Sequence, residues 1–342
     1  MANNFNVQSK LLRELVLVAE QQSGWGTAVP DSQLTRVQRF DGSAVIDYGN
    51  ERRSDKAMSG KGSSFATNGQ RTMHAAKLGG IKCEATDWTT AFVLSNLMGS
   101  LVSAGAASPY THTVKFDDGT ATSRIATPTT VYVRDTNDVA ARLLDMAVTT
   151  ATLTVPAKGS VSLEFDMIGT GLSTPGVLAA APLIPADTYL MGSDATVSFG
   201  PVGQQALFVG RFMSGVFKFE NQAMVHEAPG GGLYGIFVRK GDPKFSGSIV
   251  IAAKDVDDIL THYNADDKMA LTVTINSGAA CQLVLTYPSI NLKTTKLGFD
   301  GDMPVWNIEF DETTAYLVGN TPPVTAAITS SQPTFMTVAP AQ

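Results

Sequence analysis

The sequence predicts a mainly β protein in which two related units follow one another along the chain, each with one short α-helix. Three observations predict this architecture. Only 16% of the 342 residues are charged, 44% are hydrophobic and 31 are glycine, a composition typical of β-rich proteins with large covered surfaces. Most of the chain alternates between apolar and polar residues with a period of two. A strand followed by a helix also occurs twice, in the same order relative to a second pair of matching strands.

The predicted strands are short alternating runs bounded by Gly, Asn, Asp or Pro. Asp-Gly pairs within 116–120 and 299–304 supply the positive φ that tight hairpin turns require. Because hairpins join antiparallel neighbours, we expect mostly antiparallel strands. The clearest runs are 43–49, 80–86, 129–135, 149–155, 215–221, 247–253, 270–276 and 281–287.

Two segments break the alternation and are expected to form short helices. In 87–101 the apolar residues fall on one helical face, with Asp87 or Thr89 as the expected N-cap. Segment 255–263 shows the same spacing of apolar residues, with Asp255 as its expected cap. Each helix directly follows a predicted strand.

Two pairs of segments indicate an internal duplication. Residues 80–87 (GIKCEATD) align with 248–255 (SIVIAAKD), and each segment leads into an expected helix. Residues 161–169 (VSLEFDMIG) resemble 305–313 (VWNIEFDET), which share an acidic-aromatic-acidic sequence. The repeated order indicates two diverged copies of one unit. Chance similarity between two β-rich halves is the alternative.

The duplication divides the chain into two expected domains and two uncharged segments. The first domain covers 1–168 and the second covers 187–315. Between them, 169–186 contains no charge and three prolines, which is typical of an extended linker. The tail at 316–342 is also uncharged. We expect this tail to be disordered, or to become ordered only against a partner.

Charge and cysteine content argue against several classes of protein. A net charge of −6 and a pI near 5.2 disfavour a chain that wraps nucleic acid by neutralising phosphates. Cys83 and Cys281 lie in apolar strand patterns and are expected to be inert buried thiols. The N-terminal residues lack the features of a signal peptide, and no window reaches 18 uninterrupted apolar residues. We therefore expect a soluble protein with no membrane span, made in a cytoplasm.

No motif supports an enzyme, a metal site or a bound cofactor. The four histidines stand without a second ligand at metal spacing. The Gly-Lys pair in 58–64 lacks the flanking glycine and hydroxyl residue of a phosphate-binding loop. Segment 171–175 has proline where a nucleophile elbow requires glycine. We expect no catalytic residues, no metal ligands and no cofactor.

A long basic segment interrupts the first unit at 50–77. It is far longer than an ordinary hairpin loop, and its cations outnumber its two acids, Glu51 and Asp55. One interpretation is a mobile, solvated loop. The other is an arm that docks between stacked rings on an acidic surface of another copy. The candidate contact residues are Arg52, Arg53, Lys56, Lys61, Arg71 and Lys77.

Three stretches in order resemble the major tail tube proteins of long-tailed, siphovirus-like bacteriophages. They are 15–30, 48–62 and 77–99. The first contains the aromatic-Gly-Thr-x-x-Pro turn Trp25–Pro30, the second contains Arg53-Ser54-Asp55, and the third is a Gly-led strand that feeds a short helix. The strand at 80–87 carries less acid than is common in that family, which leaves the polarity of its surface open.

The resemblance implies two tail-tube-like β-barrels or sandwiches, each flanked by one helix, that join into rings and stack as a hollow tube. The main partner would be the chain itself, and the tape measure protein and tail-end proteins would also bind. DNA would pass through the lumen without specific binding. The expected location is the virion tail, after assembly in the host cytoplasm. A tandem β-sandwich adhesin or tail-fibre binding module is the alternative function.

The family's six-fold or pseudo-six-fold rings, taken with the duplication, favour three chains per ring. Six chains per ring is the alternative.

The two matched acidic strands supply candidate residues for the lumen. Alternation places Glu164 and Asp166 on one face of their strand, and Glu309 and Asp311 on one face of theirs, opposite the apolar side chains. In a tube, these acids could line the lumen and repel the phosphates of passing DNA. A solvated outer face without this role is the other interpretation.

Overall fold

A computed structural model gives the fold of most of the chain. It describes residues 14–18, 20–33, 36–39, 45–54, 69–116, 124–134, 140–175, 188–205, 211–227, 233–254, 258–319 and 321–338. Within these ranges the protein consists of a large and a smaller antiparallel sheet, two short strand pairs and two α-helices. The mainly β prediction is confirmed.

The large sheet has twelve strands in the described part of the chain, and eight of them follow one another as direct neighbours. Those eight run in the order β4 (Val45–Ser54), β5 (Gly69–Glu84), β10 (Ser162–Gly169), β9 (Ala140–Val155), β13 (Phe212–Glu220), β16 (Lys244–Ala252), β20 (Met303–Asp311) and β19 (Thr294–Asp300). The remaining strands are β1 (Glu14–Leu17), β3 (Arg36–Arg39), β8 (Thr129–Arg134) and β11 (Ser173–Pro175).

The smaller sheet has six strands among the described residues, and it combines strands from distant parts of the chain. Its order is β12 (Ala195–Pro201), β17 (Met269–Gly278), β18 (Cys281–Ile290), β21 (Thr325–Ser330), β7 (Tyr110–Phe116) and β6 (Gly99–Ala104). The short pairs are β14 (Met224–His226) with β15 (Phe237–Arg239), and β2 (Glu20–Gln21) with β22 (Thr337–Val338). Single 3-10 turns lie at Asp31–Gln33 and Gly192–Asp194.

Helix α1 (Asp87–Met98) lies between the two sheets, where it contacts β9 of the large sheet and β6, β7, β18 and β21 of the smaller one. The helix predicted at 87–101 is therefore confirmed, although its cap is Thr86, whose Oγ1 accepts a hydrogen bond from Thr89 N at 3.1 Å. Every residue of α1 is buried. Because two sheets enclose the helix, its polar residues are buried together with its apolar ones. Asn96, for example, accepts a hydrogen bond from Val148 N at 2.6 Å.

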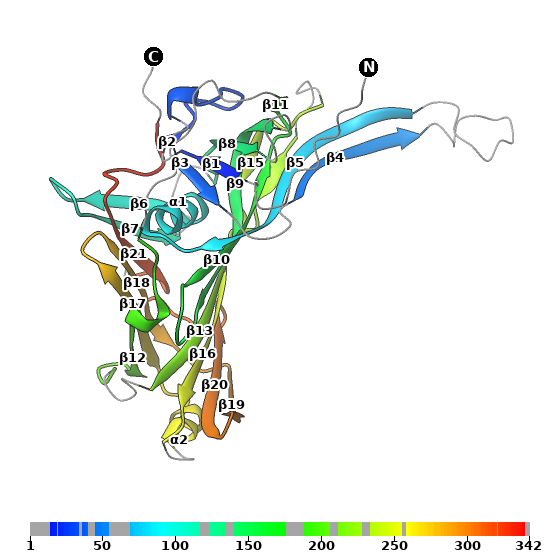
Figure 1. Ribbon diagram of the computed structural model, residues 1–342. Helices are drawn as coiled ribbons and strands as arrows, with labels where there is room; N and C mark the ends of the chain where they lie inside the picture. The colour runs from blue at the N-terminus through cyan, green and yellow to red at the C-terminus, as the bar shows by residue number, and fades with distance from the viewer. Residues whose placement is uncertain are drawn as a thin grey trace, which may run out of the picture.

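Helix α2 (Asp258–Asn264) follows β16 and lies near β19, at one end of the large sheet (Figure 1). The helix predicted at 255–263 is confirmed, and its expected first turn, 255–257, lies outside the described residues. Ile259 is buried, whereas Thr261, Tyr263 and Asn264 are exposed. The helices that follow the two matched strands thus occupy different environments.

The expected closed barrels are not found: among the described residues both sheets are open. Strand β9 pairs with β13, and β21 lies between β18 and β7. Strands from both halves of the chain therefore run into common sheets instead of closing on themselves. The main core cluster also takes residues from both halves, such as Phe165, Phe217 and Phe310. The division at 169–186 stays a prediction, and 176–187 lies outside the described residues.

The eight-strand path has a repeated order. Strands β4, β5, β10 and β9 come from the first half, and β13, β16, β20 and β19 follow in the same sequence of pairings from the second half. The two segments that precede the helices lie on and just after β5 and β16, and the two acidic segments lie on β10 and β20. The matched segments therefore occupy matched places in the sheet. The duplication itself stays a prediction.

The expectation for the C-terminal tail is wrong over residues 321–338. Strand β21 is a central strand of the smaller sheet, and β22 pairs in parallel with β2. Phe335 is fully buried and lies edge-on to Trp88, with ring centroids 5.8 Å apart. Alternating small and apolar residues such as Ala326 and Ile328 fill the core side of β21, so the segment needs no charge to become ordered.

Candidate functional site

The four candidate lumen residues lie on the face of the large sheet that turns away from the core. Along β10, Leu163 and Phe165 are buried while Glu164 is exposed. Along β20, Phe310 is buried while Glu309 is exposed. The alternation predicted for both strands is confirmed, and it places β10 and β20 on one continuous outer face.

This outer face carries both signs of charge. Glu164 lies opposite Lys82 of β5 and Thr152 of β9. Thr152 in turn lies opposite Lys218 of β13, which forms an ion pair with Glu220. The sequence did not show that these lysines would lie beside the acidic strand, because cross-strand neighbours depend on pairing. The surface is therefore polar and mixed rather than uniformly acidic.

Asp166 has a local structural role. Its Oδ1 accepts a hydrogen bond from Gly80 N at 2.8 Å, and its Oδ2 accepts one from Thr150 Oγ1 at 2.8 Å. The register between β10 and β5 shifts here, so that Gly79 and Gly80 both face Asp166. Gly80 has φ +70, a left-handed conformation that favours glycine. Asp166 thus holds a β-bulge within the pairing of β5 and β10, which continues past it to Gly169 and Ala76.

Asp311 also has local partners. Its Oδ1 accepts hydrogen bonds from Thr313 N at 2.9 Å and Thr313 Oγ1 at 2.6 Å, and its Oδ2 pairs with Lys293. Burial alone would raise the pKa of the Asp311 carboxyl, but the bonds from Lys293 and Thr313 outweigh burial and hold the pKa below its usual range. Of the four acids, Glu164 and Glu309 are exposed, whereas Asp166 and Asp311 are partly buried.

Within the basic segment 50–77, residues 50–54 and 69–77 form a projecting pair of strands, so the expectation of a loop is wrong there; residues 55–68 lie outside the described part of the chain. Strand β4 extends to Ser54 and β5 begins at Gly69, and together they lead away from the body (Figure 1). Arg52 lies opposite Arg71 in the register, and Arg53 lies opposite Gln70. Whether this arm contacts another copy stays a prediction.

The three lysines among the candidate contact residues lie elsewhere than the arginines. Lys77 is exposed where β5 lies between β4 and β10, opposite Asp47. Lys56 and Lys61 lie outside the described residues. The structure therefore brings Arg52, Arg53 and Arg71 together along the arm and places Lys77 nearer the body.

A second hairpin, β14–β15, connects β13 to β16 and folds back onto the body. Ala126 N donates to Val238 O at 2.8 Å, and Gly235 N donates to Thr170 O at 3.1 Å. The rings of Trp25 and Phe237 lie 6.2 Å apart. These contacts attach the hairpin to the upper ends of β9 and β10, as Figure 1 shows for β15.

Asp145 is a structural residue that the sequence analysis missed. It is buried, with φ +59, and its Oδ1 accepts hydrogen bonds from Gln22 Nε2 and Gly26 N, both at 2.7 Å. Its Oδ2 accepts one from Thr170 Oγ1 at 2.6 Å. The carboxylate thus fixes the Trp25–Pro30 turn to the body. The available signal was an acid inside the apolar run 143–148.

The cysteine prediction is confirmed. Cys83 and Cys281 are buried thiols that form no disulfide. Burial, with a smaller contribution from Glu84, raises the pKa of the Cys83 thiol to about 12. Such a thiol stays protonated and unreactive at neutral pH.

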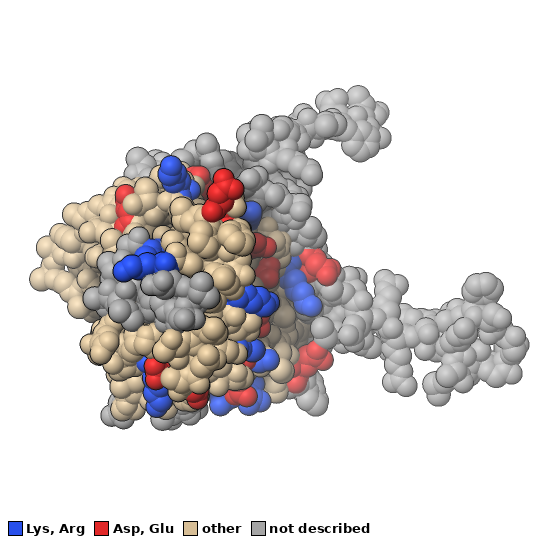
Figure 2. Space-filling view, turned by 90° about the horizontal axis from the view of Figure 1, so that it is seen from below, with Lys and Arg blue, Asp and Glu red and all other residues tan. Residues whose placement is uncertain are grey.

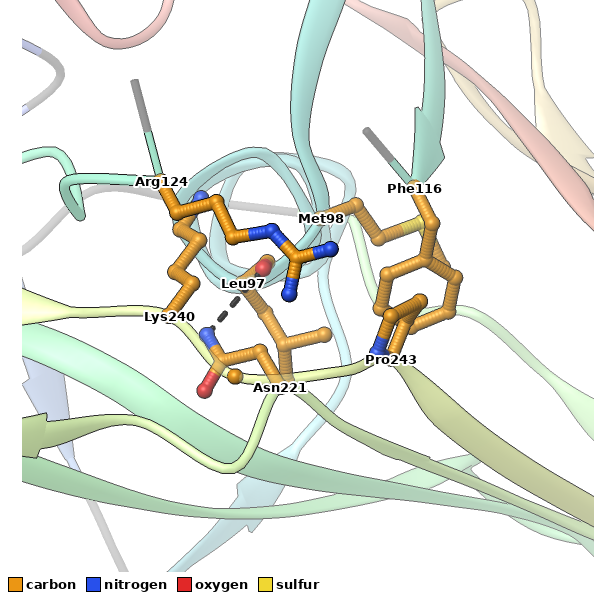
Figure 3. Close-up of a pocket in the computed structure, with 8 residues that line it drawn as sticks. Leu97, Met98, Phe116, Arg124, Asn221, Lys240 and Pro243 are labelled. Atoms are coloured by element: carbon orange, nitrogen blue, oxygen red, sulfur yellow. Dashed lines mark hydrogen bonds between the residues drawn. The ribbon is translucent and has the colours of Figure 1, made fainter. Parts of the chain in front are cut away.

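A small open pocket, with a cavity volume of about 30 Å³, lies at the C-terminal end of α1 (Figure 3). Asn221 Nδ2 donates to Leu97 O at 3.1 Å and to Val148 O at 2.7 Å, and Arg124 pairs with Asp242. Two of the polar residues that line the pocket, Asn221 and Arg124, thus already have partners within the protein. The lining residues are Leu97, Met98, Phe116, Arg124, Asn221, Lys240, Gly241 and Pro243.

Two further searches cover the described residues only. They contain no group of three or more His, Cys, Asp and Glu side chains that could hold a metal ion. None of the helices in the described ranges is long and apolar enough to cross a membrane.

Comparison with known proteins identifies the family. The family model described as "Phage tail tube protein" matches residues 12–331, which include both halves of the chain and most of its tail. A search of curated proteins finds no match. Members of this family are structural proteins that assemble into the tube of the virion tail, rather than a class of enzymes. The match confirms the resemblance seen in the sequence and does not favour an adhesin: the chain belongs to the phage tail tube protein family.

Proposed function

We propose that this chain is the repeating subunit of a phage tail tube and polymerises as stacked rings around a lumen for the genome. The observation that carries the proposal is the eight-strand path of the large sheet, which ends in two open edges, β4 and β19. Open edges with unpaired backbone groups invite pairing with another chain. In a subunit that assembles with itself, they serve as interfaces.

Ring closure follows from strand direction. Every neighbouring pair in the path is antiparallel, and the path has eight strands. Because the number is even, β19 of one copy and β4 of the next run in opposite directions. We propose that they pair as β9 and β13 do within one chain. The ring then has one continuous sheet.

The repeated strand order supports three chains per ring. If each group of four strands occupies one of six equivalent places, three chains fill the ring with pseudo-six-fold symmetry. The two groups are joined directly by the β9–β13 pairing, so adjacent places in the ring need no long linker between them. Six chains per ring, with part of each chain on the outside, is the alternative arrangement.

We further propose that the outer face of the large sheet lines the lumen. A face of polar and charged side chains lets DNA slide, and exposed carboxylates repel its phosphates. Glu164 and Glu309 are the residues for this role, because Asp166 and Asp311 are engaged in local bonds. The tape measure protein would occupy the same lumen before DNA. Assembly in the host cytoplasm and contacts with tail-end proteins belong to the same proposal.

The lumen assignment has a direct test. Replacing Glu164 and Glu309 with Lys should leave tubes intact, because both side chains are exposed, but should slow DNA ejection. The matched control is Gln at both positions, which removes charge without adding the opposite sign. Normal ejection and infectivity in the Lys variant would contradict the assignment.

Electron microscopy of the purified protein tests the function itself. We expect rings or tubes with a hollow centre at concentrations where assembly is favoured. A protein that stays monomeric at every concentration and salt condition, and that is absent from the tails of its phage, would contradict the proposed function.

A further inference from the structure

Two exposed apolar patches lie at distinct places on the described surface. The first, here called the turn patch, surrounds the turn between β19 and β20 and consists of Leu297, Phe299 and Met303. Phe299 is 74% exposed. Asp300 and Asp302 lie in the same turn, between Phe299 and Met303, and are also exposed. A phenylalanine so fully in water is unusual for a surface that stays free.

The second patch, the hairpin patch, lies on and beside β14–β15. Met224 is 58% exposed and pairs in register with Arg239, which in turn bridges to Ile125. Tyr234 and Ile236, in the segment leading into β15, are exposed as well. Arg239 thus places an exposed cation among apolar side chains.

The register puts these patches at opposite ends of the large sheet. Glu220 at the end of β13 pairs with Lys244 at the start of β16, so the hairpin patch lies beyond this end of both strands. At the other end of β16, Ala252 pairs with Val305, and the β19–β20 turn lies beyond them. Figure 1 shows β15 and the β19–β20 turn at opposite ends of the molecule.

The end that carries the turn patch is mostly uncharged. In Figure 2, which views the molecule from that end, Lys and Arg are interspersed with Asp and Glu, and broad areas have neither. Such a surface suits burial by a neighbour better than a surface of one charge sign would.

We propose that the turn patch of one copy docks onto the hairpin patch of a second copy in the adjacent ring. The apolar side chains would cover one another, and Asp300 and Asp302 would face Arg239. A contact between unlike patches at opposite ends is heterologous, so it repeats without closing and generates an open stack. This inference rests on the proposed tube function and names the surfaces through which rings stack.

A disulfide experiment tests the contact directly. Met224 and Phe299 would be replaced together by Cys in the full chain, and assembled tubes would be oxidised and run on a non-reducing gel. The native thiols are buried and do not interfere. Because each chain carries both positions, the inference predicts cross-linked ladders that extend beyond one ring. Each single Cys variant should give no ladder.

A second variant separates this inference from the proposed function. Phe299→Glu should fold normally and form rings but lose tubes longer than a few rings, whereas Leu317→Glu, a control at 65% exposure outside both patches, should form normal tubes. Tubes of normal length from Phe299→Glu, or tubes of the Cys pair without ladders, would overturn the inference while leaving the tube function intact. Failure of the unmodified chain to form tubes would instead contradict the proposed function.

Discussion

The arm formed by β4 and β5 and the hairpin formed by β14 and β15 occupy matched places in the strand order but differ in length and position. The arm projects from the body (Figure 1). The β14–β15 hairpin, which connects β13 to β16 along the chain, instead folds back onto the body. Arg52 and Arg71 lie opposite each other in the register of the arm. Backbone hydrogen bonds of Val238 and Gly235 hold the hairpin against the body.

This difference teaches that matched places in a repeated sheet need not make matched contacts. In a three-chain ring, three projecting arms would alternate with three folded hairpins at the same rim. One set would reach toward a neighbour, and the other would provide a surface for docking. Three-fold symmetry accommodates such unlike contacts, whereas strict six-fold symmetry of the six places does not.

Charge reversal on the arm should have the largest effect. Glu at Arg52, Arg53 and Lys56 should abolish tube growth while each subunit stays folded, because the arm would then repel an acidic partner surface. Sedimentation and electron microscopy measure assembly, and circular dichroism measures folding.

The matched control exchanges Lys and Arg at the same three positions and keeps the charge. This variant should assemble, and both it and the unmodified chain should assemble less well at high salt. Tubes of normal length and rate in the charge-reversed variant would show that the arm has no role in assembly.

Asp145→Ala should loosen the folded-back hairpin without affecting the arm. It removes the acceptor for Gly26 N and for the buried side chains of Gln22 and Thr170, and Gln22 keeps only its bond to Gly24 O. The free energy of unfolding should fall by about 3 kcal/mol. Hydrogen exchange should increase around Gly235 and Val238, because Phe237 rests on the Trp25 turn that Asp145 fixes. Thr170→Val, which removes one bond of this set, should have a smaller effect.

Asp166→Ala should alter the arm rather than the hairpin. It leaves the bulge at Gly80 without its carboxylate acceptor, and we expect a loss of about 1 kcal/mol in the free energy of unfolding. Denaturant unfolding measures this loss. Glu164→Ala, one pleat away and exposed, is the control and should change stability by less than about 0.5 kcal/mol. Equal effects of the two changes would argue against a structural role for Asp166.

The smallest expected effect is the pH dependence from Asp311. Its carboxyl has a lowered pKa in the folded chain, so the stabilisation is present above the ordinary value of 3.8 and is lost as pH falls through the folded value. Because Lys293 is largely exposed, the contribution should stay below about 1 kcal/mol. Asp311→Asn should lose this part of the acid dependence, measured as urea midpoints between neutral and acidic pH. If Asp311→Asn and the unmodified chain show the same dependence of stability on pH, this prediction is contradicted.

Local pattern predicted the strands, both helices and the outward acids, because alternation and helical spacing depend on neighbouring residues in the sequence. It did not predict that β21 inserts between β18 and β7, since the partner of an uncharged strand is decided by the whole core. The glycine and charge content of 50–77 favours a loop, and the pairing of β4 with β5 is not visible in local pattern. Asp145 acquires its role through residues distant in the sequence, above all Gln22, which is 123 positions away.

The central claim is that three chains form each ring, with β19 of one copy paired to β4 of the next. A tube reconstruction by electron cryomicroscopy, supported by the mass of isolated rings, tests it most directly. The predicted result is a ring of three times the 36.1 kDa chain mass, with a continuous sheet across the β19–β4 contact. A ring of six times that mass, or β4 and β19 edges that do not meet, would contradict it.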